Sequence, residues 1–182
     1  MFVMCGYLAS GKSTFARTFA KLNNYLYLSI DDTYAEFEDG YNHKFDVWIS
    51  FFKKIHQAEL EHCNVIIDVN ANTRADREDY LNWFPNFEHH LIWIDTTTEN
   101  CLINNFDRDR VIDPNYMLES FKRFEPFKYD EWGYHSGRKT KWHSVSRIIN
   151  NNNKFEFIEE LYGNTPAEVI KAFDNRSTIW FF

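Results

Sequence analysis

The sequence has few cysteines and no long hydrophobic run, and each deficit excludes a class of protein. Its three cysteines, Cys5, Cys63 and Cys101, are odd in number and form no C-x-x-C pair. That pattern argues against a disulfide framework and favours a reducing compartment. The seven histidines show no metal-ligand spacing, and we expect the pair His89 and His90 to lie on the surface. No apolar stretch approaches the roughly 20 residues of a membrane span, and the N-terminal apolar run is too short for a signal peptide. We therefore expect a cytoplasmic protein without a membrane partner.

Basic residues are also in deficit, because 20 lysines and arginines face 27 aspartates and glutamates and the formal net charge is −7. Proteins that bind long nucleic acids regardless of sequence normally present a basic face, so the composition disfavours that class. A local basic groove is still compatible with this net charge. Residues 135–143, together with Tyr134 and Trp142, mix cations and rings as a single-strand binding surface does. The alternative interpretation of this run is a solvated loop on an acidic protein.

What the chain does contain is one loop motif with every required residue. Residues 6–13 run Gly-Tyr-Leu-Ala-Ser-Gly-Lys-Ser and fit the pattern G-x-x-x-x-G-K-[ST] at each fixed position. A loop of this spacing directs backbone N–H groups at phosphate oxygens, and the following helix adds its positive end. Lys12 can then reach the β- and γ-phosphates, and the hydroxyl of Ser13 can bind Mg²⁺. The motif predicts a nucleotide-binding P-loop.

The surrounding pattern is strand, turn, helix, as this motif requires. An apolar strand is predicted at 2–5, and a helix from Ser13 to Leu22 carries Phe15, Phe19 and Leu22 on one face. Hydrophobic content of 44% over 182 residues suits one globular domain, 1–182, with a substantial core.

Strand and helix patterns alternate along most of the chain, which predicts a parallel sheet with helices on both faces. Residues 127–146 are expected to form a loop, and 150–153 a turn rich in asparagine. The expected strands are 2–5, 26–30, 65–67 and 91–94, with weaker candidates at 146–149 and 155–158, and the expected helices are 13–22, 46–62, 73–84, 98–107 and 114–124, with a final helix opened by the capping box at 165–168.

Aspartates follow the predicted strands, and in such sheets ligands bind at the carboxyl ends of the strands. Asp31 is the first candidate for a general base that accepts the proton of an acceptor hydroxyl, and Asp32 is the second. Asp68 can hold Mg²⁺ through water or position the acceptor, whereas Asp95 is expected to cap a helix. The competing interpretation of each is a capping or turn aspartate.

Two arginines lie in the polar segment 104–113, between two predicted helices. A hinged segment of this kind can close over a nucleotide and place a guanidinium on the transferring phosphate. Arg108 and Arg110 are the candidates. The alternative is that both are solvated and paired with neighbouring aspartates.

These segments together resemble the polynucleotide-kinase-like group of P-loop kinases, which includes zeta-toxin-like enzymes. Residues 6–14 resemble its phosphate loop, with Ala9 where a glycine is common, and residues 29–32 resemble its Arg-Asp-Asp segment. Residues 65–74 resemble its Ile-Ile-Asp-x-Asn stretch, and residues 121–126 are similar to a run that follows its lid. The resemblance covers roughly residues 1–127.

The resemblance implies a three-layer α/β fold with a central parallel sheet and a helical lid at about 104–126, and it leaves 128–182 unassigned within the same domain. It implies ATP and Mg²⁺ as cofactors, with Ser13 and Asp68 at the metal. Asp31 corresponds to the base, Asp68 to the acceptor side, and Arg108 to the lid arginine, with Lys12 completing the catalytic set. The nucleotide would contact Gly6, Ala9, Ser10, Gly11, Lys12, Ser13, Thr14, Arg108 and Arg110.

The acceptor is less determined, because Ile30 and Tyr34 stand where the group has arginines that hold the base and the acceptor strand. The first expectation is a kinase acting on nucleic acid, at a polynucleotide 5′-hydroxyl or a base hydroxymethyl group. The alternative is a small-molecule kinase acting on a nucleoside, nucleotide or nucleotide sugar. A non-transferring NTPase switch and a binding module without catalysis are further alternatives, and the oligomeric state is open.

Overall fold

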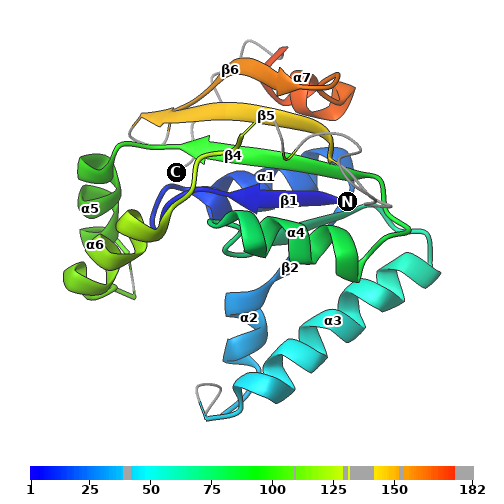
Figure 1. Ribbon diagram of the computed structural model, residues 1–182, viewed down its shortest axis with the longest axis horizontal. Helices are drawn as coiled ribbons and strands as arrows, with labels where there is room; N and C mark the ends of the chain where they lie inside the picture. Colours follow the sequence, from blue (N-terminus) through cyan, green and yellow to red (C-terminus); the bar gives the residue numbers. More distant parts are fainter. Residues whose placement is uncertain (39–41, 109, 129–130, 132–141, 152–153, 175–182) are drawn as a thin grey trace.

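The computed structural model describes residues 1–38, 42–108, 110–128, 131, 142–151 and 154–174. Its centre is a six-stranded sheet in the order β2-β3-β1-β4-β5-β6 (Figure 1). Five strands pair in parallel, and β6 runs antiparallel to β5. The α/β class with a central, mostly parallel sheet is therefore confirmed, and β6 adds an antiparallel strand at one edge. The strands are β1 Phe2–Cys5, β2 Leu26–Ser29, β3 Val65–Asp68, β4 His89–Asp95, β5 Trp142–Asn151 and β6 Lys154–Tyr162.

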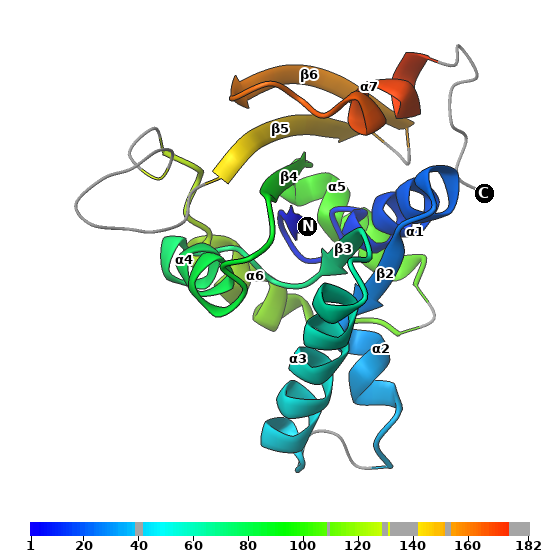
Figure 2. The same ribbon diagram turned by 90° about the vertical axis from the view of Figure 1, so that its right-hand side faces the viewer.

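Helices cover both faces of the sheet, because successive residues of a strand point to opposite sides. On β1, Phe2 and Met4 join the core under α1 and α7, while Val3 and Cys5 join the core under α3 and α4. Figure 2 shows α1 on one side of the strands and α4 on the other. The bounds are α1 Lys12–Asn23, α3 Lys44–Leu60, α4 Arg74–Trp83 and α7 Ala167–Asp174.

Three further helices stand at the carboxyl ends of the parallel strands, where the P-loop also lies (Figure 1). They are α2 Ile30–Ala35, α5 Thr98–Phe106 and α6 Pro114–Arg123. Ile30 was expected to end a strand, but Ser29 caps α2 by accepting the N–H of Asp32, and the chain turns into helix there. As a result Asp31 and Asp32 occupy the first turn of α2.

The segment expected as a loop contains the start of β5, four residues before the predicted strand. Trp142 is 1% exposed and packs edge-on against His89 of β4, so burial of this ring extends the pairing. Trp142 is therefore a core residue and not part of an aromatic binding surface, and residues 134–141 of the basic run lie outside the described residues. Asn150 and Asn151 continue β5 instead of forming the expected turn, and the rest of that turn is not described.

Two other expectations about exposure are wrong. His89 is fully buried on β4, and its neighbour His90 is largely buried and stacks on Phe2. Burial lowers the pKa of His89 to about 3, because the charged imidazolium is poorly solvated there. Leu22, by contrast, is 58% exposed, since the apolar face of α1 ends at Phe19 and Ala20. None of the described helices is long and apolar enough to span a bilayer.

Candidate functional site

The P-loop adopts backbone angles that its sequence makes accessible. Gly6 and Gly11 have φ of +139° and +95°, in the region that favours glycine. A Cβ on Gly6 would collide with the carbonyl oxygen of Ile94, and one on Gly11 would lie 2.6 Å from Nδ2 of Asn150. Ala9, which stands where the resembled group has a glycine, also has a positive φ of 60°. A residue with a Cβ costs about 1–2 kcal/mol in this conformation, so the loop holds Ala9 against its preference.

Side chains from distant segments form hydrogen bonds with the backbone of this loop. Thr96 Oγ1 and Asn150 Nδ2 both donate to the carbonyl oxygen of Ser10, at 2.9 and 2.8 Å. Asn104 Nδ2 donates to Ala9 O at 3.1 Å, and Asn72 Oδ1 accepts the N–H of Gly6 at 3.3 Å. The carbonyl oxygens are thereby held away from any ligand. These four residues were not identified from the sequence, and the only signal is that Asn72 and Thr96 follow strand ends.

The amide groups at the start of α1 remain available for an anion. The first intrahelical bond runs from Phe15 N to Gly11 O at 3.0 Å. The N–H groups of Lys12, Ser13 and Thr14 consequently have no acceptor within the helix, and the helix end adds a positive partial charge. This is the arrangement in which a phosphate group binds to backbone.

Lys12 is nearly buried and folds over its own loop. Its Nζ donates to the carbonyl oxygens of Gly6 and Tyr7, at 2.9 and 2.7 Å. Burial lowers the pKa of the ammonium group, and the Asp68 carboxylate opposes that change by favouring the charged form. A phosphate oxygen offers the ammonium group a stronger, charge-assisted partner than these carbonyls.

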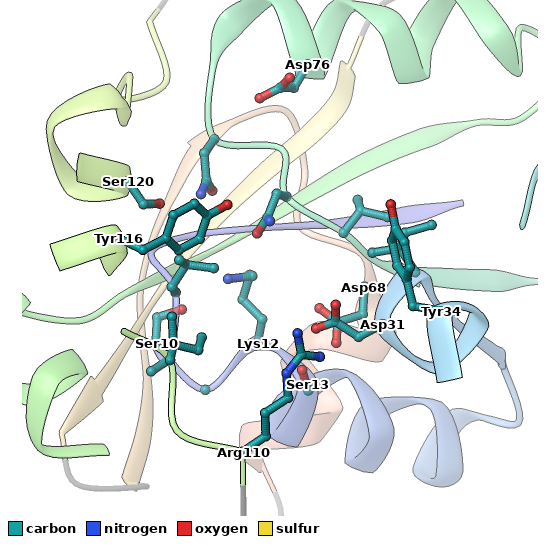
Figure 3. Close-up of a pocket in the computed structure, with 18 of the residues that line it drawn as sticks. Ser10, Lys12, Ser13, Asp31, Tyr34, Asp68, Asp76, Arg110, Tyr116 and Ser120 are labelled. Carbon is teal, nitrogen blue, oxygen red and sulfur yellow. The ribbon is translucent and has the colours of Figure 1, made fainter. Parts of the chain in front are cut away.

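The loop borders a cavity of about 1120 Å³ at the carboxyl edge of the sheet (Figure 3). This cavity brings together residues that the sequence spreads over more than 100 positions. Of the candidate site residues, Gly6 directly follows β1 and does not line the cavity. Those that do line it are Ala9, Ser10, Gly11, Lys12, Ser13, Thr14, Asp31, Asp68, Arg108 and Arg110.

The structure separates the two candidate bases. Asp31 lines the cavity together with Lys12. Asp32 instead binds Arg17 of α1, with Nη2 at 2.8 and 2.9 Å from its two carboxylate oxygens. Both side chains of this pair are about half exposed, at 55% and 49%. Asp32 is therefore committed to a surface ion pair on the outer side of α2.

Asp68 ends β3 and is 6% exposed. The hydroxyl of Tyr27 donates to its Oδ2 at 2.9 Å, and burial together with this carboxylate raises the pKa of Tyr27. Asp68 lines the same cavity as the hydroxyl of Ser13. One carboxylate and one hydroxyl suit Mg²⁺, which keeps several waters and takes its remaining ligands from phosphates. In the described part of the chain, no cluster of three or more His, Cys, Asp or Glu residues is suited to hold a metal ion.

Asp95 was expected to cap a helix, but Thr97 caps α5. Asp95 instead pairs with Arg147 of β5, whose Nε and Nη2 lie 2.9 and 2.5 Å from its Oδ2. The guanidinium also stands over the ring of Trp93, 5.2 Å from its centroid. This contact joins β4 to β5 at the edge beside the P-loop.

The two candidate lid arginines both line the cavity. They lie in the segment that joins α5 to α6. In Figure 3 the guanidinium of Arg110 points toward the carboxylates of Asp31 and Asp68. Asn105 holds this segment, because its amide donates to Ile112 O and accepts the N–H of Ile112, at 2.8 and 2.9 Å.

We expect Asn150→Ala to raise the dissociation constant of ATP about tenfold, because a buried hydrogen bond to the P-loop is lost and Ser10 O loses a donor. Titration calorimetry with a non-hydrolysable ATP analogue measures the change. Asn151→Ala is the matched control, since Asn151 is the exposed neighbour on the same strand. Equal affinities of the two variants would show that Asn150 does not position the loop.

Comparison with known proteins agrees with this geometry. A family model described as "AAA domain" matches residues 1–122, which is more than half of the chain. No curated protein matches the sequence. The structural neighbours include a sugar kinase from Janibacter sp. HTCC2649, with 16% identity and a TM-score of 0.57 over 82% of this chain and 83% of that one.

A gluconokinase from Sinorhizobium meliloti 1021 superposes with a TM-score of 0.53 at 14% identity, covering 69% of this chain and 74% of the other. The protein TT1252 from Thermus thermophilus covers 97% of both chains at 13% identity with a TM-score of 0.50. At these identities the likeness concerns the fold alone. The fold is that of P-loop kinases, a mostly parallel sheet flanked by helices, whereas the narrower polynucleotide-kinase-like assignment stays a prediction.

Proposed function

The chain belongs to the AAA domain family, and from that premise we propose that it is an ATP- and Mg²⁺-dependent kinase that transfers the γ-phosphate to a hydroxyl group. One observation carries the proposal. A P-loop with accessible amides and a buried lysine lines the same cavity as Asp31, a carboxylate that no described ion pair occupies. A carboxylate that lines the cavity beside the phosphate loop is placed to accept the proton of an acceptor hydroxyl.

In the proposed reaction the N–H groups of residues 12–14 and the ammonium group of Lys12 hold the β- and γ-phosphates. Bound Mg²⁺, held by Ser13 and through water by Asp68, would neutralise phosphate charge. Asp31 accepts the acceptor's proton as its oxygen bonds to the γ-phosphorus, and the bond from that phosphorus to the bridging oxygen of ADP breaks. Arg108 and Arg110 balance negative charge on the transferring group from the side of the lid.

For the acceptor, a nucleic-acid hydroxyl and a small-molecule hydroxyl both remain proposals. The sugar kinase and the gluconokinase among the neighbours are named for small molecules, and this supports a small-molecule acceptor at least as much as a nucleic-acid acceptor. We further propose that residues 1–182 act as one kinase domain in the cytoplasm, consistent with three free cysteines and a single continuous sheet.

The decisive assay incubates the protein with γ-labelled ATP, Mg²⁺ and a panel of oligonucleotides, nucleosides and sugars. We expect label on one class of acceptor. We expect Lys12→Met to lower the transfer rate by about 10²–10³-fold, because it removes the positive charge that stabilises the transferring phosphate. Label released only as inorganic phosphate with every acceptor would favour the NTPase switch. Failure to bind ATP at all would remove the basis of the proposal.

A further inference from the structure

One wall of the cavity is aromatic and lies away from the P-loop. It consists of Tyr34 on α2, Trp48 on α3, and Tyr80 and Trp83 on α4, and we call it the aromatic wall. Figure 3 shows Tyr34 beyond Asp31 as seen from Lys12. Because Asp31 is the proposed base, this wall borders the space in which the acceptor must lie.

The rings of the aromatic wall are held in place before any ligand binds. Phe52 packs between the two tryptophans, with ring centroids 5.5 Å from Trp48 and 4.9 Å from Trp83. Tyr80 meets Trp83 edge-on at 5.6 Å. Trp83 nevertheless remains 47% exposed. Large aromatic side chains that are fixed and yet exposed in a cavity offer contact area at little entropic cost.

The charged residues of this half of the cavity are mostly acidic. Its lining residues from α2, α3, α4 and the segment 69–73 include Asp31, Asp76 and Asp79 but a single cation, Lys44. Asp76 is engaged in the capping box of α4 with Thr73. Among described residues, the arginines that line the cavity all come from 108–123, on the side of the lid. A phosphate group on an acceptor that lies against the aromatic wall would thus meet Asp76 and Asp79, with Lys44 as the one lining cation described in that half of the cavity.

We propose that the acceptor is a small alcohol that carries an uncharged ring and no phosphate, and that the ring packs on Trp48 and Trp83 while its hydroxyl faces Asp31. This assignment rests on the proposed kinase function and narrows its substrate. A ring face gains from contact with aromatic side chains whether it belongs to a base or to a sugar. The acidic surroundings discriminate against the phosphorylated form of the same compound. A nucleoside and a free sugar share this chemistry, and a polynucleotide 5′-end does not.

Binding can be measured without transfer, by calorimetry in the presence of a non-hydrolysable ATP analogue and Mg²⁺. The panel uses matched pairs: adenosine and thymidine against their 3′-monophosphates, glucose and N-acetylglucosamine against their 6-phosphates, and a 5′-hydroxyl oligonucleotide. We expect at least one uncharged ring compound to bind, and its phosphorylated partner to bind at least tenfold more weakly. The base and sugar arms tell the two sources of the ring apart.

The wall itself is tested by Trp83→Ala, with Trp48→Leu as a second variant. Each should weaken acceptor binding about tenfold while the affinity for the ATP analogue stays unchanged, which also reports that the fold is intact. Phe45→Ala is the matched control, because Phe45 is 77% exposed on α3 and does not line the cavity.

Three results would overturn the assignment: tighter binding of a phosphorylated compound or the oligonucleotide, no binding by any uncharged ring compound, or no effect of both tryptophan variants. The proposed function fails differently. Transfer of label to the oligonucleotide would support kinase activity and contradict the proposed acceptor. Binding of a nucleoside or sugar without any transfer would support the proposed binding site and contradict kinase activity.

Discussion

Replacing Asp31 with asparagine should lower the rate of phosphoryl transfer by about 10²–10⁴-fold, the usual contribution of a general base. Asparagine has nearly the same shape but cannot accept a proton from the acceptor hydroxyl. The P-loop does not depend on this side chain, so the affinity for ATP should change little. Single-turnover transfer from γ-labelled ATP measures the effect, and calorimetry with an ATP analogue provides the comparison.

The matched control is the neighbouring residue. Asp32→Asn changes the same chemical group one position along α2, but its carboxylate binds Arg17 outside the cavity. An exposed ion pair of this kind contributes about 0–1 kcal/mol, so both activity and stability should stay close to those of the unmodified protein. If Asp32→Asn lost transfer while Asp31→Asn kept it, the general base would be Asp32 and our assignment of Asp31 would be wrong. If Asp31→Asn and Asp32→Asn hydrolysed ATP at equal rates without any acceptor, the result would favour the non-transferring NTPase switch.

Arg77→Met should lower the free energy of unfolding by about 3–5 kcal/mol, because it breaks a buried ion pair by removing one partner. Arg77 on α4 is fully buried, and its Nε and Nη2 lie 2.7 and 2.8 Å from the carboxylate oxygens of Glu131. Its Nη1 also donates to the carbonyl oxygens of Ala71 and Glu125, at 3.3 and 2.9 Å. The substitution leaves the buried carboxylate of Glu131 and the buried carbonyl group of Ala71 without these donors. Urea unfolding at constant m-value measures the change.

Lys122→Met is the control for Arg77, since the pair of Lys122 and Glu119 is exposed at 70% and 67% and should contribute less than about 1 kcal/mol. The double variant Arg77→Met, Glu131→Met tests the cause. If uncompensated charge is responsible, removing both partners should cost less than removing Arg77 alone. A single variant as stable as Lys122→Met would mean that water reaches and solvates Glu131.

The effect of Arg77 also bears on the site. Ala71 and Asn72 join β3 to α4, and Asn72 contacts Gly6 of the P-loop. The N–H of Glu125 donates to Asn72 O at 2.9 Å, so the segment after α6 is attached to the same connection. Arg77 thus holds two segments together, the connection between β3 and α4 at Ala71 and the segment after α6 at Glu125. Sequence reasoning did not identify it, because a buried arginine has no signature apart from its distant partner.

Much of the fold could be predicted because its signals are local. The first four strands and most helices between them follow hydrophobic periods and caps, and the capping box of Thr73 and Asp76 is present as expected. Helix α2 is an exception, because Ser29 caps it where a strand was expected to continue. The errors in strand bounds are largest after residue 127, where burial depends on distant neighbours. Trp142 belongs to a strand because β4 lies beside it, and Asn150 belongs to one because it reaches Ser10.

The amino-acid sequence by itself determined the phosphate-binding element of this protein. Its spacing of glycines, lysine and serine is sufficient because a phosphate cradle is made of consecutive backbone groups and one helix end. Tertiary structure alone decided which aspartate faces the cavity, since the position of Arg17 draws Asp32 away from it. Tertiary structure also decided what surrounds the proposed acceptor site, because side chains of three separate helices, α2, α3 and α4, form the aromatic wall. Packing between these helices determines such a surface, and the pattern within any one of them does not encode it.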